Sequence, residues 1–300
     1  MKKILSILFI LSSSLVTFAK LNVVATTGDF GTIAKEIGGD KISVITLARP
    51  TEDPHFVDAK PSFIAKLNRA DALIDGGAEL EIGWLPPLLE GARNEKLEAG
   101  KPGRIECAAG ISLLEVPATL DRSKGDIHAA GNPHYMVDPE NGRIAAKEIC
   151  DAFCQLVPDA ADSFKANLVK FNAKLDAKLA EWQKLMEPFK GRRIVAYHNS
   201  WPYFARRFGI KIDLFLEPKP GIPPTPANLA NVVERIKAEK IGIIIVDPYL
   251  NRKTAETVAR DTGATVVDVS QFPGGMKPAD TGYIEFIDHL VKSIASAMGK

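Results

Sequence analysis

The feature that most constrains this fold is a regular alternation of short apolar runs and amphipathic stretches, which occurs in two blocks of the chain. In the first block, β-branched runs at 21–27, 42–47 and 72–75 alternate with helical patterns near 30–37, 61–68 and 81–92, and one or two further strand candidates lie in 104–116. In the second block, strand candidates at 193–197, 212–215, 241–246 and 264–269 alternate with helical patterns near 201–208, 226–238, 253–261 and 283–297. Strands and helices that alternate at this spacing predict parallel βαβ units.

Between the two blocks, from about 159 to 189, lies a segment that contains no glycine and a single proline, Pro188. Its apolar residues recur at steps of three and four, at Leu168, Phe171, Leu175, Leu179 and Trp182. This pattern predicts one amphipathic helix of roughly 28 residues. The apolar repeat is too brief for the several heptads of a coiled coil, so we expect a helix that crosses between two lobes.

The predicted fold is therefore α/β, with two lobes that carry parallel sheets and are joined by one long helix. We place the N-terminal lobe at 20–157, the linking helix at 158–189 and the C-terminal lobe at 190–300. Ligands of open α/β sheets bind beyond the carboxyl ends of the strands. Two facing lobes therefore predict a site in the cleft between them.

Residues 1–19 have the pattern of a secretory signal peptide. Lys2 and Lys3 precede an apolar run at 4–11, and small residues lead to a cleavage site after Ala19. The apolar run is short for a membrane span, although an uncleaved anchor is the alternative. No cysteine lies near the cleavage site, so we expect no lipid attachment there. These features predict a soluble protein exported to the periplasm.

Composition excludes several classes of protein. The chain is 46% hydrophobic and 25% charged with a formal net charge of +1, and no basic run indicates nucleic-acid binding. Cys107, Cys150 and Cys154 are an odd set for an oxidising compartment. Cys150 and Cys154 share one face of a predicted helix, where a disulfide would constrain little. We expect free, buried thiols, which pack as small apolar residues.

Four side chains that can bind a metal fall at the mouths of the predicted α/β units. His55 and His134 each follow a proline in a loop, His198 ends a predicted strand, and Asp280 precedes the last helix. Imidazole nitrogens and a carboxylate oxygen suit a divalent transition ion. A lone loop histidine is more often solvated than a ligand, so the residues alone leave both interpretations open. For His128 we expect simple exposure.

The motifs around these residues give the chain a resemblance to a known family. The segments that carry it are 53–55 with 60–62, 132–135 with 138–141, His198 with 203–209, and Asp280 with Tyr283. In this order, and with the long helix, the chain resembles the zinc/manganese-type (cluster A-I) substrate-binding proteins of bacterial metal-uptake ABC transporters. The resemblance covers essentially all of the chain after residue 19.

The resemblance implies two Rossmann-like lobes joined by a rigid helix. It also implies a monomer that binds a metal ion between these lobes and delivers it to an ABC-type membrane permease. It implies His55, His134, His198 and Asp280 as the metal ligands. Two residues depart from the family pattern: Asn132 replaces an aspartate, and Asn199 stands where an acidic residue is frequent. The histidine-rich loop of many zinc members is also missing, since His128 is the one histidine at 118–133.

Three imidazoles and one carboxylate favour Zn²⁺ over Mn²⁺, which prefers more oxygen ligands. Within the resemblance, a histidine at the position of His198 is typical of zinc members and a glutamate of manganese members. The alternatives are Mn²⁺ or Fe²⁺ as cargo of the same transporter class, an exported metal-dependent adhesin, or a zinc hydrolase. No HExxH pair, nucleophile elbow or P-loop is present, so we expect no enzyme activity.

Overall fold

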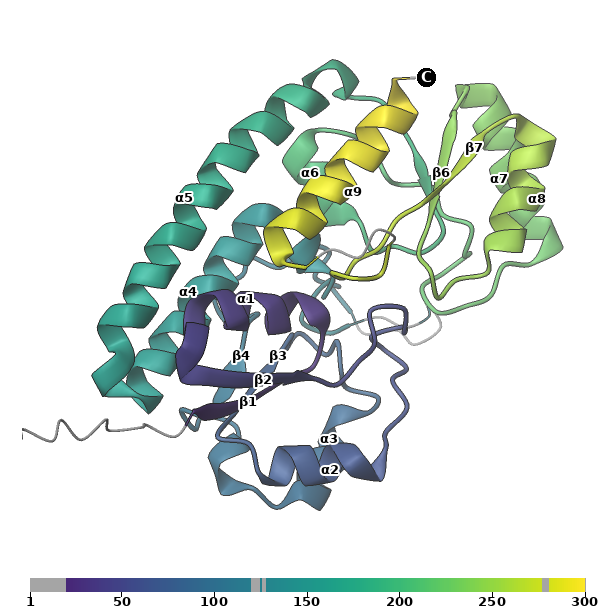
Figure 1. Cartoon of the computed structure of the whole chain (residues 1–300). Helices are drawn as coiled ribbons and strands as arrows, with labels where there is room; N and C mark the ends of the chain where they lie inside the picture. The colour runs from purple at the N-terminus through teal and green to yellow at the C-terminus, as the bar shows by residue number, and fades with distance from the viewer. Residues whose placement is uncertain (1–19, 120–124, 126–127, 277–280, 300) are drawn as a thin grey trace, which may run out of the picture.

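Two parallel sheets lie at either end of the molecule in a computed structural model, which describes residues 20–119, 125, 128–276 and 281–299 (Figure 1). The N-terminal sheet has the order β2-β1-β3-β4, with β1 at Leu21–Ala25, β2 at Ile42–Thr46, β3 at Ala72–Asp75 and β4 at Arg104–Glu106. The C-terminal sheet has the order β5-β6-β7, with β5 at Val195–Ala196, β6 at Ile243–Val246 and β7 at Thr265–Asp268. All of these pairings are parallel, as the sequence predicts.

Helices cover both faces of each sheet, because the buried strands are apolar on both sides. In the N-terminal lobe, α1 (Gly28–Gly38) and α4 (Pro139–Leu156) lie on one face, and α2 (Pro61–Asn68) and α3 (Leu85–Ala92) on the other (Figure 1). In the C-terminal lobe, α6 (Pro202–Phe208) and α9 (Tyr283–Met298) lie opposite α7 (Pro226–Glu239) and α8 (Arg252–Thr262). Short 3-10 turns occupy η1 (Gly39–Lys41), η2 (Glu95–Leu97), η4 (Tyr135–Val137), η5 (Pro158–Ala160) and η6 (Glu187–Phe189).

The long helix α5 runs from Ala161 to Met186, 26 residues, along the side of both lobes (Figure 1). It buries one stripe of apolar side chains, Phe164, Phe171, Leu175, Trp182 and Met186. This stripe belongs to a single core that also includes residues of α1, α4, α6 and α9. The helix is therefore packed against both lobes along its length, and it is not a solvent-exposed linker.

Two sequence predictions differ from the structure. The predicted strand at 212–215 forms a single isolated bridge, between Phe215 and Ala196 of β5, although Ala196 N also donates to Leu214 O at 3.1 Å. The segment 104–116, predicted to contain one or two strands, contains one, β4, which ends at a turn closed by Ala109 N and Glu106 O. Helix α3 also begins later than predicted, at Leu85, with prolines in its first turn.

The thiols behave as predicted: Cys107, Cys150 and Cys154 are free, and the first two are buried. Among the described residues, no helix has both the length and the apolar character that a membrane crossing requires.

Candidate metal centre

Three of the four predicted ligands converge at the carboxyl ends of the strands. His55 lies in the loop after β2, His134 directly before η4, and His198 two residues after β5. Their nearest ligand atoms all lie within 4.8 Å of one another, and Nε2 of His55 lies 3.2 Å from Nε2 of His134. Two nitrogens bound at about 2.0–2.1 Å to one tetrahedral ion lie roughly 3.3 Å apart. The spacing of these imidazoles therefore fits two ligands of one metal ion.

The fourth predicted ligand, Asp280, lies outside the described residues. His128 is half-buried and not simply exposed: its ring stacks on that of His55, with the ring centroids 4.9 Å apart and the planes 23° apart. The cluster of three does not include His128. Its position beside the cluster was not predicted, because nothing in the loop sequence indicates which ring it meets.

Burial keeps two of the imidazoles neutral. His55 is 8% exposed and His134 is 6% exposed. Burial, reinforced by the neighbouring histidines, lowers the pKa of His55 to about 3 and holds the pKa of His134 well below its usual value. A neutral imidazole has a lone pair to offer, so both rings are ready to bind a cation at ordinary pH.

His198 differs from the other two because a carboxylate contacts it. Burial alone would lower the pKa of His198, but the hydrogen bond and charge of Glu217, with smaller effects of Asp53 and Asp247, raise it above its usual value. Nδ1 of His198 lies 2.6 Å from Oε2 of Glu217. The carboxylate can only accept, so Nδ1 carries the proton and Nε2 is left for a metal.

Neutral groups lie beside the other two rings. The backbone of Leu80 acts to raise the pKa of His55, and the side chain of Gln271 acts to raise that of His134, against the larger effect of burial. Since the Nε2 atoms of these two rings lie 3.2 Å apart, Nδ1 is the atom left for these partners. In all three histidines Nε2 is thus the atom available to a metal, with a partner group for Nδ1, as is usual for metal-ligating histidines.

The loops that carry His55 and His134 share one local structure. In both, an Asx side chain accepts a hydrogen bond from the backbone N–H of the histidine two residues later: Asp53 to His55 and Asn132 to His134, each at 3.0 Å. The intervening residue is proline, which restricts the backbone of each loop. These Asx turns stiffen the loops before any ligand binds.

A buried carboxylate that the sequence analysis missed, Asp247, lies beside the cluster. It directly follows β6, is 1% exposed, and accepts a hydrogen bond through Oδ1 from Nε2 of Gln271 at 3.2 Å. Its Oδ2 has no hydrogen-bond partner among the described residues. Burial raises the pKa of Asp247 to about 7, against the lowering effects of Gln271 and His198. An acidic residue at the end of a fully apolar strand was the signal that could have identified it.

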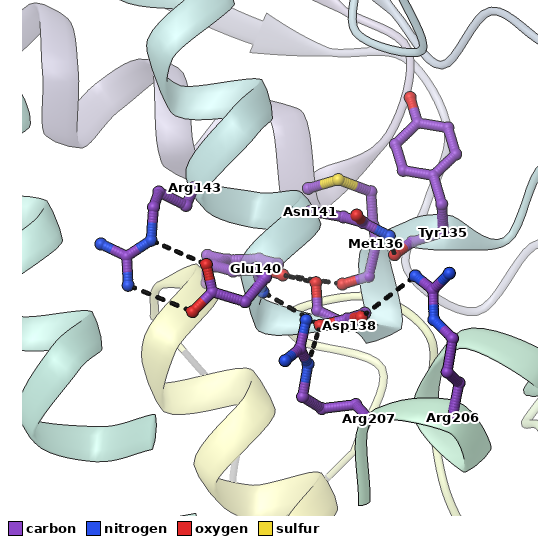
Figure 2. A network of polar contacts seen from close by, with 9 residues as sticks. Tyr135, Met136, Asp138, Glu140, Asn141, Arg143, Arg206 and Arg207 are labelled. Carbon is purple, nitrogen blue, oxygen red and sulfur yellow. Dashed lines mark hydrogen bonds and ion pairs between the residues drawn. The ribbon is translucent and has the colours of Figure 1, made fainter. Parts of the chain in front are cut away.

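A polar network fixes the His134 segment to the other lobe (Figure 2). Asp138, fully buried at the start of α4, lies with Oδ1 2.7 Å from Nε of Arg207 and Oδ2 3.6 Å from Nη2 of Arg206, both on α6. Oδ1 also accepts from Glu140 N at 3.0 Å and so caps α4. Because α6 begins four residues after His198, this network joins the elements that carry His134 and His198.

Two α/β lobes against one long helix, with buried histidines between them, define a substrate-binding protein of a metal-uptake ABC transporter. The model of the ZnuA family, "Zinc-uptake complex component A periplasmic", matches residues 23–297, and the chain belongs to this family. Members of that family are substrate-binding components of transporters and not enzymes.

Individual relatives are distant but cover most of the chain. The manganese ABC transporter substrate-binding lipoprotein PsaA of Streptococcus anginosus is 26% identical over 82% of this chain and 78% of its own length. The iron ABC transporter substrate-binding lipoprotein MtsA of Streptococcus pyogenes serotype M1 is 25% identical over 88% of this chain and 84% of its own. The crystal structure of a ZnuA deletion mutant with zinc bound superposes with a TM-score of 0.77 at 25% identity, covering 93% of this chain and 98% of that one.

Proposed function

We propose that this chain captures Zn²⁺ in the periplasm and delivers it to the permease of an ABC transporter. Family membership supports the general role in this proposal, that of a metal-binding component of an uptake system. The observation that carries the rest is the convergence of His55, His134 and His198 at the cleft with Nε2 of each ring available.

The proposed ligand set is His55, His134, His198 and Asp280. The convergence of the first three supports their assignment, whereas Asp280 rests on the family resemblance. Four protein ligands close the coordination sphere of a tetrahedral ion, which suits capture, whereas a catalytic zinc keeps one position open for water. We also propose that residues 1–19 are a cleaved leader, that 158–189 links lobes at 20–157 and 190–300, and that the mature chain acts as a monomer.

Zn²⁺ is the favoured cargo because the site is rich in nitrogen. Imidazole ligands suit zinc, and Zn²⁺ stands above Mn²⁺ and Fe²⁺ in the general order of affinity. The second candidate is Mn²⁺ or Fe²⁺, the metals in the names of the two lipoproteins. The carboxylate of Asp247, whose Oδ2 has no hydrogen-bond partner among the described residues, favours this alternative, because oxygen is the ligand atom that Mn²⁺ prefers.

Competitive titration of the metal-stripped mature chain with Zn²⁺, Mn²⁺ and Fe²⁺ tests this function. We expect one equivalent of Zn²⁺, bound more tightly than the other two ions and lost in His198→Ala. His289→Ala, a histidine of α9 outside the cluster, is the control and should bind as the wild type does. Failure of the wild type to bind any of the three ions would contradict the proposal, and tighter binding of Mn²⁺ or Fe²⁺ than of Zn²⁺ would select the second candidate.

A further inference from the structure

Three polar side chains connect the loop of His134 to the loop of His198 across the two lobes. Asn132 stands two residues before His134, Asn199 directly follows His198, and Glu115 lies in the segment after β4. Asn132 is buried, Asn199 is half-buried and Glu115 is exposed. Two of these residues, Asn132 and Asn199, are the positions at which the sequence departs from the pattern it resembles.

Both polar atoms of the Asn132 side chain, Oδ1 and Nδ2, form hydrogen bonds in this connection. Its Oδ1 accepts from the backbone N–H of His134 at 3.0 Å. Its Nδ2 donates to Oε2 of Glu115 at 3.0 Å and to the carbonyl oxygen of Asn199 at 2.9 Å, so both of its hydrogens have acceptors. The orientation of the amide is therefore fixed, and one side chain contacts both histidine loops.

Glu115 accepts a second hydrogen bond, from a side-chain amide of the opposite lobe. Nδ2 of Asn199 donates to the same oxygen, Oε2 of Glu115, at 2.8 Å. Glu115 has a φ of 55°, a left-handed conformation that is uncommon for a residue with a side chain. These two charge-assisted hydrogen bonds give a physical reason for a carboxylate at that strained position.

Asparagine and aspartate are not interchangeable here. An aspartate at 132 could still accept from His134 N, but it has no hydrogen to donate to Glu115 or to the Asn199 carbonyl. It would also place a second carboxylate about 3 Å from the first, where like charges repel. An aspartate at 199 would have the same effect from the other lobe. The two asparagines and the glutamate therefore form one consistent set.

We infer that Glu115, Asn132 and Asn199 are positioning residues that hold the His134 and His198 loops together before the metal binds. This inference rests on the proposed function and deepens it. Tyr203 of α6 supports the same arrangement, because its hydroxyl donates to Asn132 O at 2.6 Å and accepts from Leu114 N at 2.8 Å. A preassembled pair of loops lowers the ordering cost of binding and so raises metal affinity.

The test is a charge-rescue series in the mature full-length chain, with Zn²⁺ as the probe. We expect Asn132→Asp to weaken Zn²⁺ binding about 10-fold or more, which is the usual effect of losing such an outer contact. Adding Glu115→Gln should restore most of the loss, because the glutamine amide can donate to the new aspartate. Asn251→Asp makes the same charge change at the exposed cap of α8 and should leave affinity unchanged.

A second readout uses metal-free protein. Amide hydrogen exchange at Leu114 and Ser200 should speed up in Asn132→Asp and slow again in the double variant, while core amides of β1 and β6 report that the fold is intact. Should Asn132→Asp not fold, Asn199→Asp with the same rescue takes its place. Wild-type affinity in the single variant, or a loss that Glu115→Gln does not reverse, overturns the inference. A wild type that binds no metal but shows the exchange pattern would refute the proposed function and leave the positioning role supported.

Discussion

Oε2 of Glu217 lies 2.6 Å from Nδ1 of His198, so the imidazole two residues after β5 has a carboxylate at the nitrogen that is not left for a metal. Neutral groups, the backbone of Leu80 and the side chain of Gln271, lie beside the other two rings of the cluster. This difference makes His198 the most basic of the three and the one whose metal affinity depends most on an outer residue.

Removing the charge of Glu217 tests this relationship. Glu217→Gln keeps an acceptor for Nδ1 but removes the negative charge, and we expect Zn²⁺ affinity at pH 8 to fall about 10-fold. Glu234→Gln, on the exposed face of α7, is the matched control. Equal affinities of the wild type and Glu217→Gln in competitive titration would show that Glu217 does not act through His198.

Metal binding should release few protons, and its pH dependence should therefore be shallow. Protonated His198 cannot bind a metal, so affinity falls as pH falls through its raised pKa. Asp247, with a pKa near 7, adds a second proton in the same range. His55, with a pKa of about 3, and His134 stay neutral and add none. We therefore expect log affinity to change by at most two units per pH unit between pH 5 and 8. A slope of three would indicate that His55 or His134 titrates in this range as well.

Asp247 should contribute its charge to the site. Asp247→Asn keeps the volume of the side chain but removes a buried negative charge near His198, and we expect about 10-fold weaker Zn²⁺ binding and a pH slope reduced by one proton. The control is Asp268→Asn, an exposed aspartate at the end of the neighbouring strand β7. An unchanged slope in Asp247→Asn would assign the second proton to another group.

The network of Figure 2 should stabilise the contact between the lobes. Asp138→Ala leaves Arg207 without its buried carboxylate and α4 without its cap. Because Arg207 is partly exposed, we expect a loss of about 2–3 kcal/mol in the free energy of unfolding. Asp151→Ala, which removes an exposed ion pair on the same helix, should cost less than about 1 kcal/mol. Urea unfolding measures both, and equal midpoints for the two variants would contradict this role for Asp138.

The sequence predicts the parallel strands, the long helix and the positions of the three histidines, because each depends on local periodicity or on the end of a strand. It does not predict what surrounds the rings. Glu217 is 19 residues from His198 in the same lobe, so this contact depends on how the chain folds within that lobe. Glu115 is 84 residues from Asn199, in the other lobe, so that contact depends on how the two lobes pack. The segment 212–215 has the composition of a strand but forms a single isolated bridge, since pairing depends on a neighbour as well as on residue type.

X-ray absorption at the zinc edge of the protein loaded with one equivalent of Zn²⁺ tests the central claim most directly. The account predicts three imidazole nitrogens at about 2.0–2.1 Å and one carboxylate oxygen. His134→Ala should lose one imidazole from the fitted shell, and His289→Ala should lose none. A wild-type shell with fewer than three imidazoles, or one that His134→Ala leaves unchanged, would contradict a metal centre built on His55, His134 and His198.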